Sequence, residues 1–216
     1  MKITAITKKN GTRWQVDVDD EYWAILDAEI IVEHHLKTGV ELTETRMEEI
    51  LHAADLRRAR ERALYLLDYR DHSRAELVEK LSRNVDREIA LEVVDRLGGL
   101  GLIDDAAYAK KLARKLILTK KYGPRRAVYE LRRKGIDLGT AAEAVDAVEP
   151  EEGLLEDLVR RKYARYLEDG EDEKGREKVI RALMRLGHGY YDAAAAVDAA
   201  AAQLMEEKDG ELDPDE

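Results

Sequence analysis

The sequence predicts a mainly α-helical protein in which three tandem three-helix repeats form an elongated, curved array, preceded by a small amino-terminal module of strands and one helix. Three observations predict this fold. Prolines occur only at 124, 150 and 214, and strong helix formers dominate from residue 45 onward. Asn10-Gly11 lies between two stretches of alternating polarity, which is typical of a β-hairpin. Beyond residue 56 the sequence repeats itself.

The amino-terminal module should cover residues 1–56. A two-residue type I′ turn at Asn10-Gly11 sets the register of the hairpin. The expected cross-strand partners are Ile3 with Val18, Ala5 with Val16, and Thr7 with Trp14. A third strand over 21–26 follows, then a helix over 28–36 that Asp27 caps and that stops near Gly39.

The repeats are visible in three segments that align without gaps: 73–81 (SRAELVEKL), 123–131 (GPRRAVYEL) and 175–183 (GREKVIRAL). A helix with a Val-Asp pair follows each segment, and a further helix precedes each one, near 57–70, 104–120 and 151–167. We therefore predict repeats at 57–103, 104–150 and 151–205. One unit is too small to bury much alone, so we expect stacking to supply a continuous core. Residues 206–216, with seven acids and one lysine, should form a disordered acidic tail.

Helix punctuation supports these boundaries. The expected signals are a Ser73/Glu76 capping box, an Asp104 N-cap, Pro124 at a first helical position, and stops at Gly98, Gly135 and Gly187. We expect Tyr190 and Tyr191 to pack in cores or between modules.

Composition excludes several classes of protein. The chain has 37 basic and 47 acidic residues, a net charge of −10. It has no cysteine, so disulfide frameworks, thiolate metal sites and thiol nucleophiles are excluded. No apolar run is long enough to span a bilayer, and the amino terminus lacks the pattern of a secretory signal, so we expect a cytoplasmic protein without a membrane partner.

The charge is distributed unevenly. Residues 110–134, the basic segment, contain eleven Lys or Arg and one acid, Glu130, which gives +10 locally and −20 for the rest of the chain. The spacing in 124–133 places Arg125, Arg126, Tyr129, Arg132 and Arg133 on one side of a helix. The repeats act as an internal control, because the equivalent outward positions can be compared. They carry both acidic and basic side chains in the first repeat, and mainly basic side chains in the second and third repeats. These positions are Glu76, Glu79 and Arg83, then Arg126, Tyr129 and Arg133, then Lys178, Arg181 and Arg185.

Such a surface fits an anionic partner. Neutralised phosphates would give salt-sensitive binding that does not depend on sequence, and Tyr122 or Tyr129 could stack on a base of a single strand. An acidic protein surface would serve equally well, and a merely solvated helix face is the alternative without a partner.

The sequence offers little for catalysis. Gly98 to Gly101 follows a helix instead of a strand, so it reads as a helix-ending turn and not as a phosphate loop. The five histidines form no HExxH motif, and Asp104-Asp105 begins a helix, where capping accounts for both acids. We predict no enzyme, no catalytic residues, no metal, no cofactor and no small-molecule substrate.

Three stretches also carry a family likeness: SRAELVEKL (73–81), GLGLIDDAAYA (99–109) and YGPRRAVYELRRKGI (122–136). With them the sequence resembles the RecX family of regulatory proteins over about residues 57–205, most clearly in 60–136. The resemblance implies tandem three-helix repeats and a non-enzymatic role. Members bind the RecA recombinase filament on single-stranded DNA, lie in its groove, and restrain filament growth, ATP hydrolysis and strand exchange in recombination and DNA repair. Some also bind DNA themselves.

The predicted partner-binding and DNA-binding residues combine the basic segment with the third repeat. They are Lys110, Lys111, Arg114, Lys115, Lys120, Lys121, Tyr122, Arg125, Arg126, Tyr129, Arg132, Arg133, Lys134, Lys178, Arg181 and Arg185. The predicted partner is the RecA filament, with single-stranded or duplex DNA as a further ligand. Two alternatives stay open: a stand-alone DNA-binding protein, and a helical scaffold that docks an acidic peptide.

Overall fold

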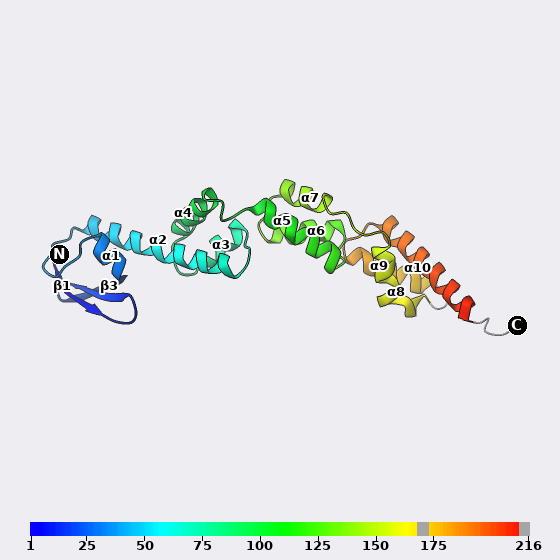
Figure 1. Ribbon diagram of the computed structural model, residues 1–216, viewed down its shortest axis with the longest axis horizontal. Helices are drawn as coiled ribbons and strands as arrows, with labels where there is room; N and C mark the ends of the chain where they lie inside the picture. Colours follow the sequence, from blue (N-terminus) through cyan, green and yellow to red (C-terminus); the bar gives the residue numbers. More distant parts are fainter. Residues whose placement is uncertain (168–172, 212–216) are drawn as a thin grey trace. The chain divides into compact units, whose positions relative to one another are not determined.

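The computed structural model describes residues 1–167 and 173–211 (Figure 1). The chain divides into two compact units, Met1–Ile103 and Asp104–Glu216. In the first unit the elements are β1 (Ile3–Lys8), β2 (Arg13–Val18), β3 (Glu21–Asp27), α1 (Ala28–Glu33), α2 (Glu44–Tyr69), α3 (Arg74–Leu81) and α4 (Arg87–Gly99). In the second they are α5 (Asp105–Arg114), the π-helical turn η1 (Lys115–Thr119), α6 (Pro124–Arg133), α7 (Leu138–Asp146), α8 (Leu154–Tyr163), the 3₁₀ turn η2 (Ala164–Tyr166), α9 (Glu173–Arg185) and α10 (Tyr190–Glu211).

The three strands form an antiparallel sheet in the order β1-β2-β3, as expected, but the predicted register is wrong over most of the hairpin. Ile3 does pair with Val18, whereas Ile6, not Ala5, pairs with Val16. The loop is one residue longer than a type I′ turn, because Lys9 N–H donates to the Arg13 carbonyl across Asn10–Thr12. An irregularity between Ile3 and Ala5 absorbs the extra residue and lets both Ile3 and Ile6 join the core.

The helix after the sheet is shorter than predicted, since α1 ends at Glu33. Asp27 stands at its N-cap, but its side chain accepts no cap hydrogen bond and instead accepts one from Thr12 Oγ1 at 3.3 Å. The boundary near residue 56 is not a break in the chain, because α2 runs through it for 26 residues. The buried cluster under the sheet ends at Ala54, and the next one begins at Ala59, so one helix serves two cores.

Each repeat consists of three helices, which confirms the predicted fold class (Figure 1). The predicted caps are also present. Ser73 and Glu76 form the capping box, Asp104 Oδ1 accepts from Ala107 N–H at 2.9 Å, and Pro124 opens α6. Gly135 and Gly187 follow α6 and α9 with φ of 80° and 94°. After α4, the left-handed residue is Gly101 and not Gly98, which lies within the helix.

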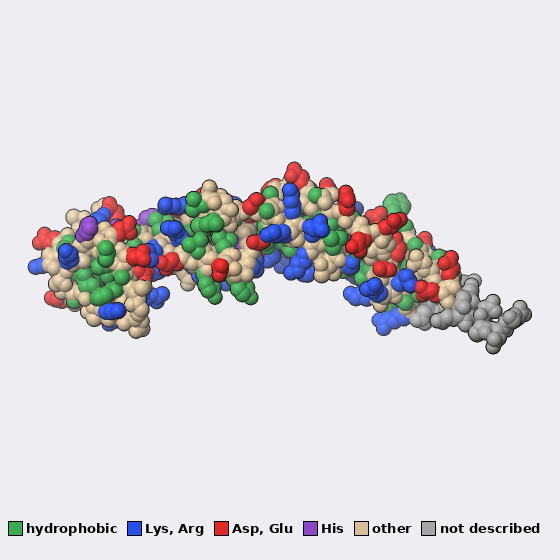
Figure 2. All heavy atoms as spheres, in the orientation of Figure 1, with side chains coloured by type: hydrophobic (Ala, Val, Ile, Leu, Met, Phe, Trp, Pro, Cys, Tyr) green, Lys and Arg blue, Asp and Glu red, His purple; other side chains and the backbone are tan. Residues whose placement is uncertain are grey.

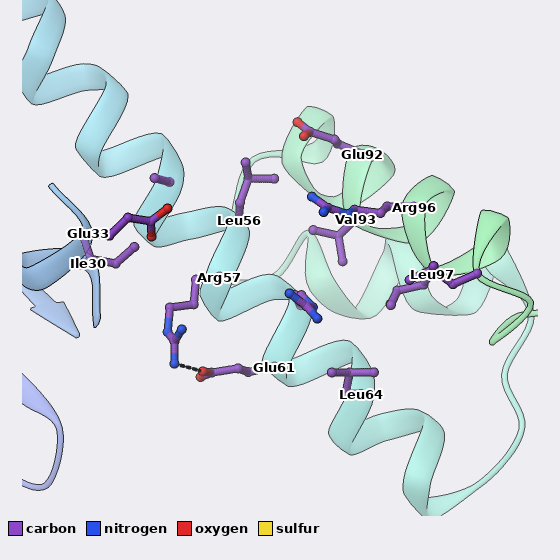
Figure 3. A pocket seen from close by; sticks show the side chains of 13 residues that line it. Ile30, Glu33, Leu56, Arg57, Glu61, Leu64, Glu92, Val93, Arg96 and Leu97 are labelled. Carbon is purple, nitrogen blue, oxygen red and sulfur yellow. Dashed lines mark ion pairs between the residues drawn. The ribbon is translucent and has the colours of Figure 1, made fainter. Parts of the chain in front are cut away.

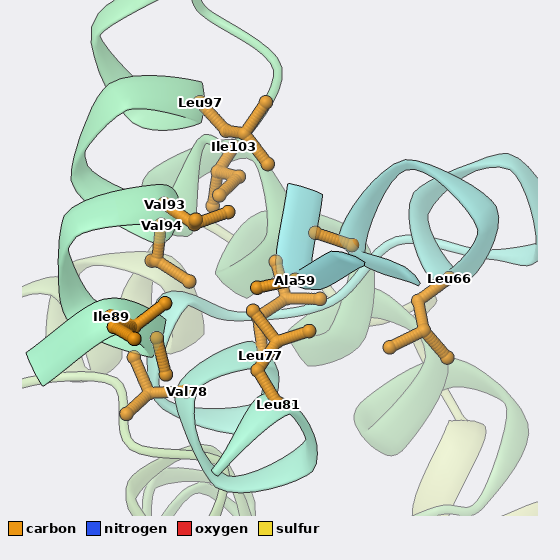
Figure 4. Packing of buried hydrophobic residues seen from close by; sticks show 12 residues of the cluster. Ala59, Leu66, Leu77, Val78, Leu81, Ile89, Val93, Val94, Leu97 and Ile103 are labelled. Carbon is orange, nitrogen blue, oxygen red and sulfur yellow. The ribbon is translucent and has the colours of Figure 1, made fainter. Parts of the chain in front are cut away.

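The prediction of a continuous core is wrong. The buried residues that the structure describes form four separate clusters: one under the sheet and one within each repeat. In the first repeat Leu77, Leu81 and Val94 are almost fully buried among residues from α2, α3 and α4 (Figure 4). Three helices therefore enclose a core of their own, because Ala and Val at the contacts let the helices approach closely.

The third repeat ends in a helix longer than expected. α10 continues to Glu211, so the first residues of the predicted disordered tail are helical, and 212–216 lie outside the described residues. Arg160 of α8 pairs with Glu207 at 2.5 Å and holds the extension. Tyr190 and Tyr191 do not pack in a core: they are 55% and 85% exposed and meet edge to face, with ring centroids 5.7 Å apart.

A candidate cationic interaction surface

The first part of the surface comes from α5 and η1. Ala109, Ala113, Leu116 and Ile117 are buried against the second repeat's core, which leaves the basic residues between them on the outside. Those residues are Lys110, Lys111, Arg114, Lys115 and Lys120, all exposed. The π turn over 115–119 widens the helix just before Lys120, whose N–H donates to the Lys115 carbonyl at 3.1 Å.

The second part is α6, where four of the five residues of the predicted basic face are exposed: Arg125, Tyr129, Arg132 and Arg133. Ala127 and Leu131 are fully buried, while Arg125, Arg132 and Arg133 are exposed. Arg125 and Arg132 form no ion pair with any described residue. Their guanidinium groups are thus available to an external anion without first breaking a bond within the protein.

Arg126 occupies a different position from the one predicted. Its guanidinium carbon lies 4.1 Å from the centroid of the Tyr122 ring, and Nη1 donates to the Arg185 carbonyl at 3.3 Å. Its Nε also lies 3.9 Å from Glu130 Oε1. Arg126 therefore joins the second repeat to the third. Sequence reasoning missed this role because the acceptor is 59 residues away.

The two candidate stacking tyrosines also differ. Tyr122 packs against the core and is covered by Arg126, with Lys120 at 5.8 Å, so its ring is already used. Tyr129 is 60% exposed, and its one ring contact with the described residues is with the Arg133 guanidinium carbon, 6.0 Å from the ring centroid. Of this pair, Tyr129 is the ring that offers a face to a ligand.

Lys121 and Lys134 contribute less than expected, because both are only half-exposed. Lys121 adopts a left-handed conformation with φ of 57°, and its carbonyl accepts from His188 Nε2 at 3.0 Å. Its backbone thus helps to join the repeats. Lys134 caps the end of α6.

The third part comes from α9, where Lys178, Arg181 and Arg185 are exposed. Arg181 pairs with Glu177 at 3.1 Å, and the Lys178 ammonium lies 4.3 Å from the centroid of the Tyr166 ring. Arg165, which sequence reasoning missed, donates to Tyr166 Oη at 2.8 Å. That hydrogen bond, helped by the nearby cations, lowers the pKa of the Tyr166 hydroxyl.

Two glycines hold the second and third repeats together. Gly123 N–H donates to the Leu186 carbonyl at 2.9 Å, and the two loops touch so closely that a Cβ on Gly123 would lie 2.3 Å from the Gly187 carbonyl carbon. This contact holds the start of α6 against the end of α9, where Arg126 Nη1 also donates to the Arg185 carbonyl, so the basic residues of the second and third repeats meet at this junction. Figure 2 shows Lys and Arg side chains gathered over α5 and α6 and again near α8 and α9.

We call this combined region the cationic surface. It consists of Lys110, Lys111, Arg114, Lys115, Lys120, Arg125, Tyr129, Arg132, Arg133, Lys178, Arg181 and Arg185. The equivalent side chains of the first repeat have structural roles instead. Glu76 is largely buried in the capping box and pairs with Arg70, and Glu79 pairs with Arg83 at 3.2 Å.

A cavity of about 520 Å³ lies in the first unit, between α1, α2 and α4 (Figure 3). Leu56 and Val93 supply apolar walls, and Arg57 pairs with both Glu29 and Glu61. The Arg57 guanidinium in the wall is thus neutralised by two carboxylates. Within 1–167 and 173–211 no group of three or more His, Asp or Glu could hold a metal ion, and no helix there is long and apolar enough to cross a membrane.

Comparison with known proteins points to a single family. The models of the first and second three-helix domains of RecX match residues 59–97 and 104–145. The chain is 29% identical to the regulatory protein RecX of Clostridioides difficile over 85% of this chain and 87% of that protein. It is 32% identical to the Bacillus velezensis RecX over 72% and 60%.

Solved structures agree with these matches. The crystal structure of a regulatory protein RecX superposes with a TM-score of 0.66 at 26% identity, covering 92% of this chain and 98% of the other. RecX from Lactobacillus salivarius superposes with a TM-score of 0.58 at 26% identity, over 70% and 97%.

Proposed function

We propose, from the premise that this chain belongs to the RecX family of regulatory proteins, that it binds the RecA filament on single-stranded DNA and restrains its ATP hydrolysis, growth and strand exchange. In this proposal the protein acts without catalysis and without a cofactor, in the cytoplasm where the recombinase works. Its effect comes from occupying a surface that the filament needs.

The observation that carries the proposal is the cationic surface on an otherwise acidic chain. Residues 110–134 carry +10 against −20 elsewhere, and Arg125 and Arg132 have no acidic partner among the described residues. Such segregated charge favours a partner that presents closely spaced anions, as DNA phosphates and acidic grooves do.

The acidic remainder of the chain favours a nucleoprotein filament over bare duplex DNA. It would be repelled by a partner that is uniformly negative, whereas a filament offers both anionic and basic regions. Several repeats can also contact successive subunits of a filament, and each further contact raises the overall affinity.

The test is ATP hydrolysis by the cognate recombinase on single-stranded DNA, titrated with this protein. Wild-type protein should inhibit, and the double variant Arg125→Glu with Arg132→Glu should need at least about tenfold more protein, because four units of charge are lost at the contact. The control is Lys8→Glu with Lys9→Glu, which changes the charge equally on exposed residues of the sheet module and should inhibit normally.

Other results would point to the alternatives. Tight binding of duplex DNA without inhibition would indicate a stand-alone DNA-binding protein. Capture of an acidic peptide with no effect on the recombinase would indicate a scaffold. Equal inhibition by both double variants, with unchanged circular dichroism, would contradict the role given to the cationic surface.

A further inference from the structure

One face of α2 presents aromatic and basic side chains together. Arg58, Arg62, Tyr65 and Tyr69 follow one another at intervals of four, three and four residues, so they lie in a single stripe along the helix. Tyr65 is 64% exposed and Tyr69 is 82% exposed. The side of α2 that carries Ala59, Ala63 and Leu66 is buried instead, so this stripe does not serve the core.

The tyrosine rings have little contact with the rest of the protein. The Arg62 guanidinium lies 5.1 Å from the centroid of the Tyr65 ring and covers one face of it. Tyr69 makes no ring contact or hydrogen bond with any described residue. Because an exposed aromatic ring gains nothing from packing, two of them one turn apart indicate a surface that a ligand covers.

The surrounding charge indicates the chemistry of that ligand. Between Arg57 and Arg70 there are five arginines against two acids, Glu61 and Asp68. Arg58 pairs with Asp55 at 3.3 Å, while Arg62 has no acidic partner within the described part of the chain. Exposed rings interleaved with arginines are what proteins use to hold single-stranded nucleic acid.

We infer that the stripe Arg58–Arg62–Tyr65–Tyr69 binds single-stranded DNA by stacking unpaired bases on Tyr65 and Tyr69. Arg62 contacts the adjoining phosphate. The two tyrosines are separated by about 6 Å along the helix axis, which suits neighbouring bases that have been drawn apart. This inference rests on the proposed function, which supplies the single-stranded DNA. It adds that the first repeat contacts the bases of the DNA as well as its phosphates.

The exposed pair Tyr190 and Tyr191 provides a contrast within the same chain. These rings already contact each other edge to face with centroids 5.7 Å apart, and no arginine of 1–167 or 173–211 is stacked on either of them. Exposure of a pair of tyrosines is therefore not what distinguishes the stripe. Its rings are distinguished by the arginines beside them. Tyr191→Ala removes a ring of similar exposure and is a matched control.

The test is fluorescence anisotropy of a labelled twenty-nucleotide oligothymidylate titrated with the full-length protein. Tyr65→Ala with Tyr69→Ala should weaken binding by about tenfold or more. Tyr65→Phe with Tyr69→Phe and Tyr191→Ala should each bind like wild type, because the first keeps the stacking rings and the second lies elsewhere. Thermal unfolding checks that each variant is folded.

Photocrosslinking locates the contact independently. With a bromouracil-substituted oligonucleotide, the crosslink should map to the tryptic peptide 63–70, which contains both tyrosines. Absence of oligothymidylate binding by the wild type, or equal binding by the alanine pair, overturns the inference. Loss of recombinase binding by the alanine pair with oligonucleotide affinity unchanged would make the stripe a protein contact, and would overturn it too.

These outcomes are separate from a failure of the proposed function. If the alanine pair loses oligonucleotide binding while the wild type does not inhibit the recombinase, the stacking site stands and the regulatory proposal fails. If the wild type inhibits and the alanine pair binds oligonucleotide normally, the regulatory proposal stands and the stacking site fails.

Discussion

Gly187 joins the second repeat to the third because it has no side chain. Its φ of 94° is in the left-handed region, and a Cβ there would lie 2.5 Å from Arg126 Cβ and 2.6 Å from Arg126 N. Both the conformation and the contact require glycine. The neighbouring hydrogen bonds, from His188 to the Lys121 carbonyl and from Arg126 to the Arg185 carbonyl, depend on that close approach.

Gly187→Ala should therefore lower the free energy of unfolding by about 2–4 kcal/mol, the sum of backbone strain and a steric clash. Gly153 is the matched control, since its φ is 77° but nothing lies within 4 Å of its Cβ position. Gly153→Ala should cost only the strain, about 1–2 kcal/mol. Urea denaturation measures both; equal losses would show that the contact contributes nothing.

His72 should make stability depend on pH. It is 3% exposed, its Nδ1–H donates to the Arg70 carbonyl at 2.9 Å, and burial lowers its pKa below the ordinary value of 6.5. The folded state therefore favours the neutral ring, whereas the unfolded state takes up a proton as the pH falls below 6.5. This contribution is complete above pH 6.5 and is lost as the pH falls toward the folded-state pKa.

Thermal unfolding at pH 7.5 and pH 5.5 checks this expectation. Wild-type protein should lose more stability on acidification than His72→Gln, which cannot take up the proton. Identical pH profiles for the two proteins would contradict the role given to His72.

Among the individual residues, the helix caps could be predicted from sequence, because the side chains of Ser73, Glu76 and Asp104 bond to backbone groups within three residues. The role of Arg126 could not be. Its charge and position on the helix predict an outward side chain, and only the fold brings the Arg185 carbonyl within reach.

Among the elements, the Val-Asp helices reveal a recurrent ion pair. Asp95 of α4 pairs with Arg74 of α3, and Asp198 of α10 pairs with Arg176 of α9. In the second repeat Pro124 replaces the arginine, so Asp146 lacks this partner. The same position thus links two helices in the first and third repeats but not in the second.

Asp95→Asn should lower the free energy of unfolding by about 0.5–1 kcal/mol, a modest value because the pair is well exposed. Asp146→Asn should change it by less than about 0.5 kcal/mol, since no such pair is lost. Chemical denaturation of the two variants compares them directly, and a larger loss at Asp146 would contradict this account of the repeat.

The order and type of the elements followed from sequence because periodicity and punctuation are local. The hairpin register did not, since one added loop residue shifts every pair from Ala5 to Lys8, and the compensating irregularity depends on the core that Ile3 and Ile6 share. The length of α2 was also missed, because no helix breaker marks the point where one core gives way to the next.

Across the whole molecule, charge is segregated more sharply than solubility requires. The second and third repeats present the cationic surface, while the net charge of the chain is −10. A partner that meets this surface should release counterions on binding, so its affinity should fall as salt rises. Basic composition predicted most of these residues; the junction that joins α6 to α9 required the structure.

The most direct test of the central claim is the affinity of this protein for recombinase filaments on single-stranded DNA, measured by co-sedimentation at several salt concentrations. Wild-type binding should weaken steeply with salt. The variant Arg125→Glu with Arg132→Glu should bind more weakly, with a slope of log Kd against log salt smaller by about 2. Equal affinity and equal slope for the two proteins would contradict the claim that the cationic surface contacts the filament.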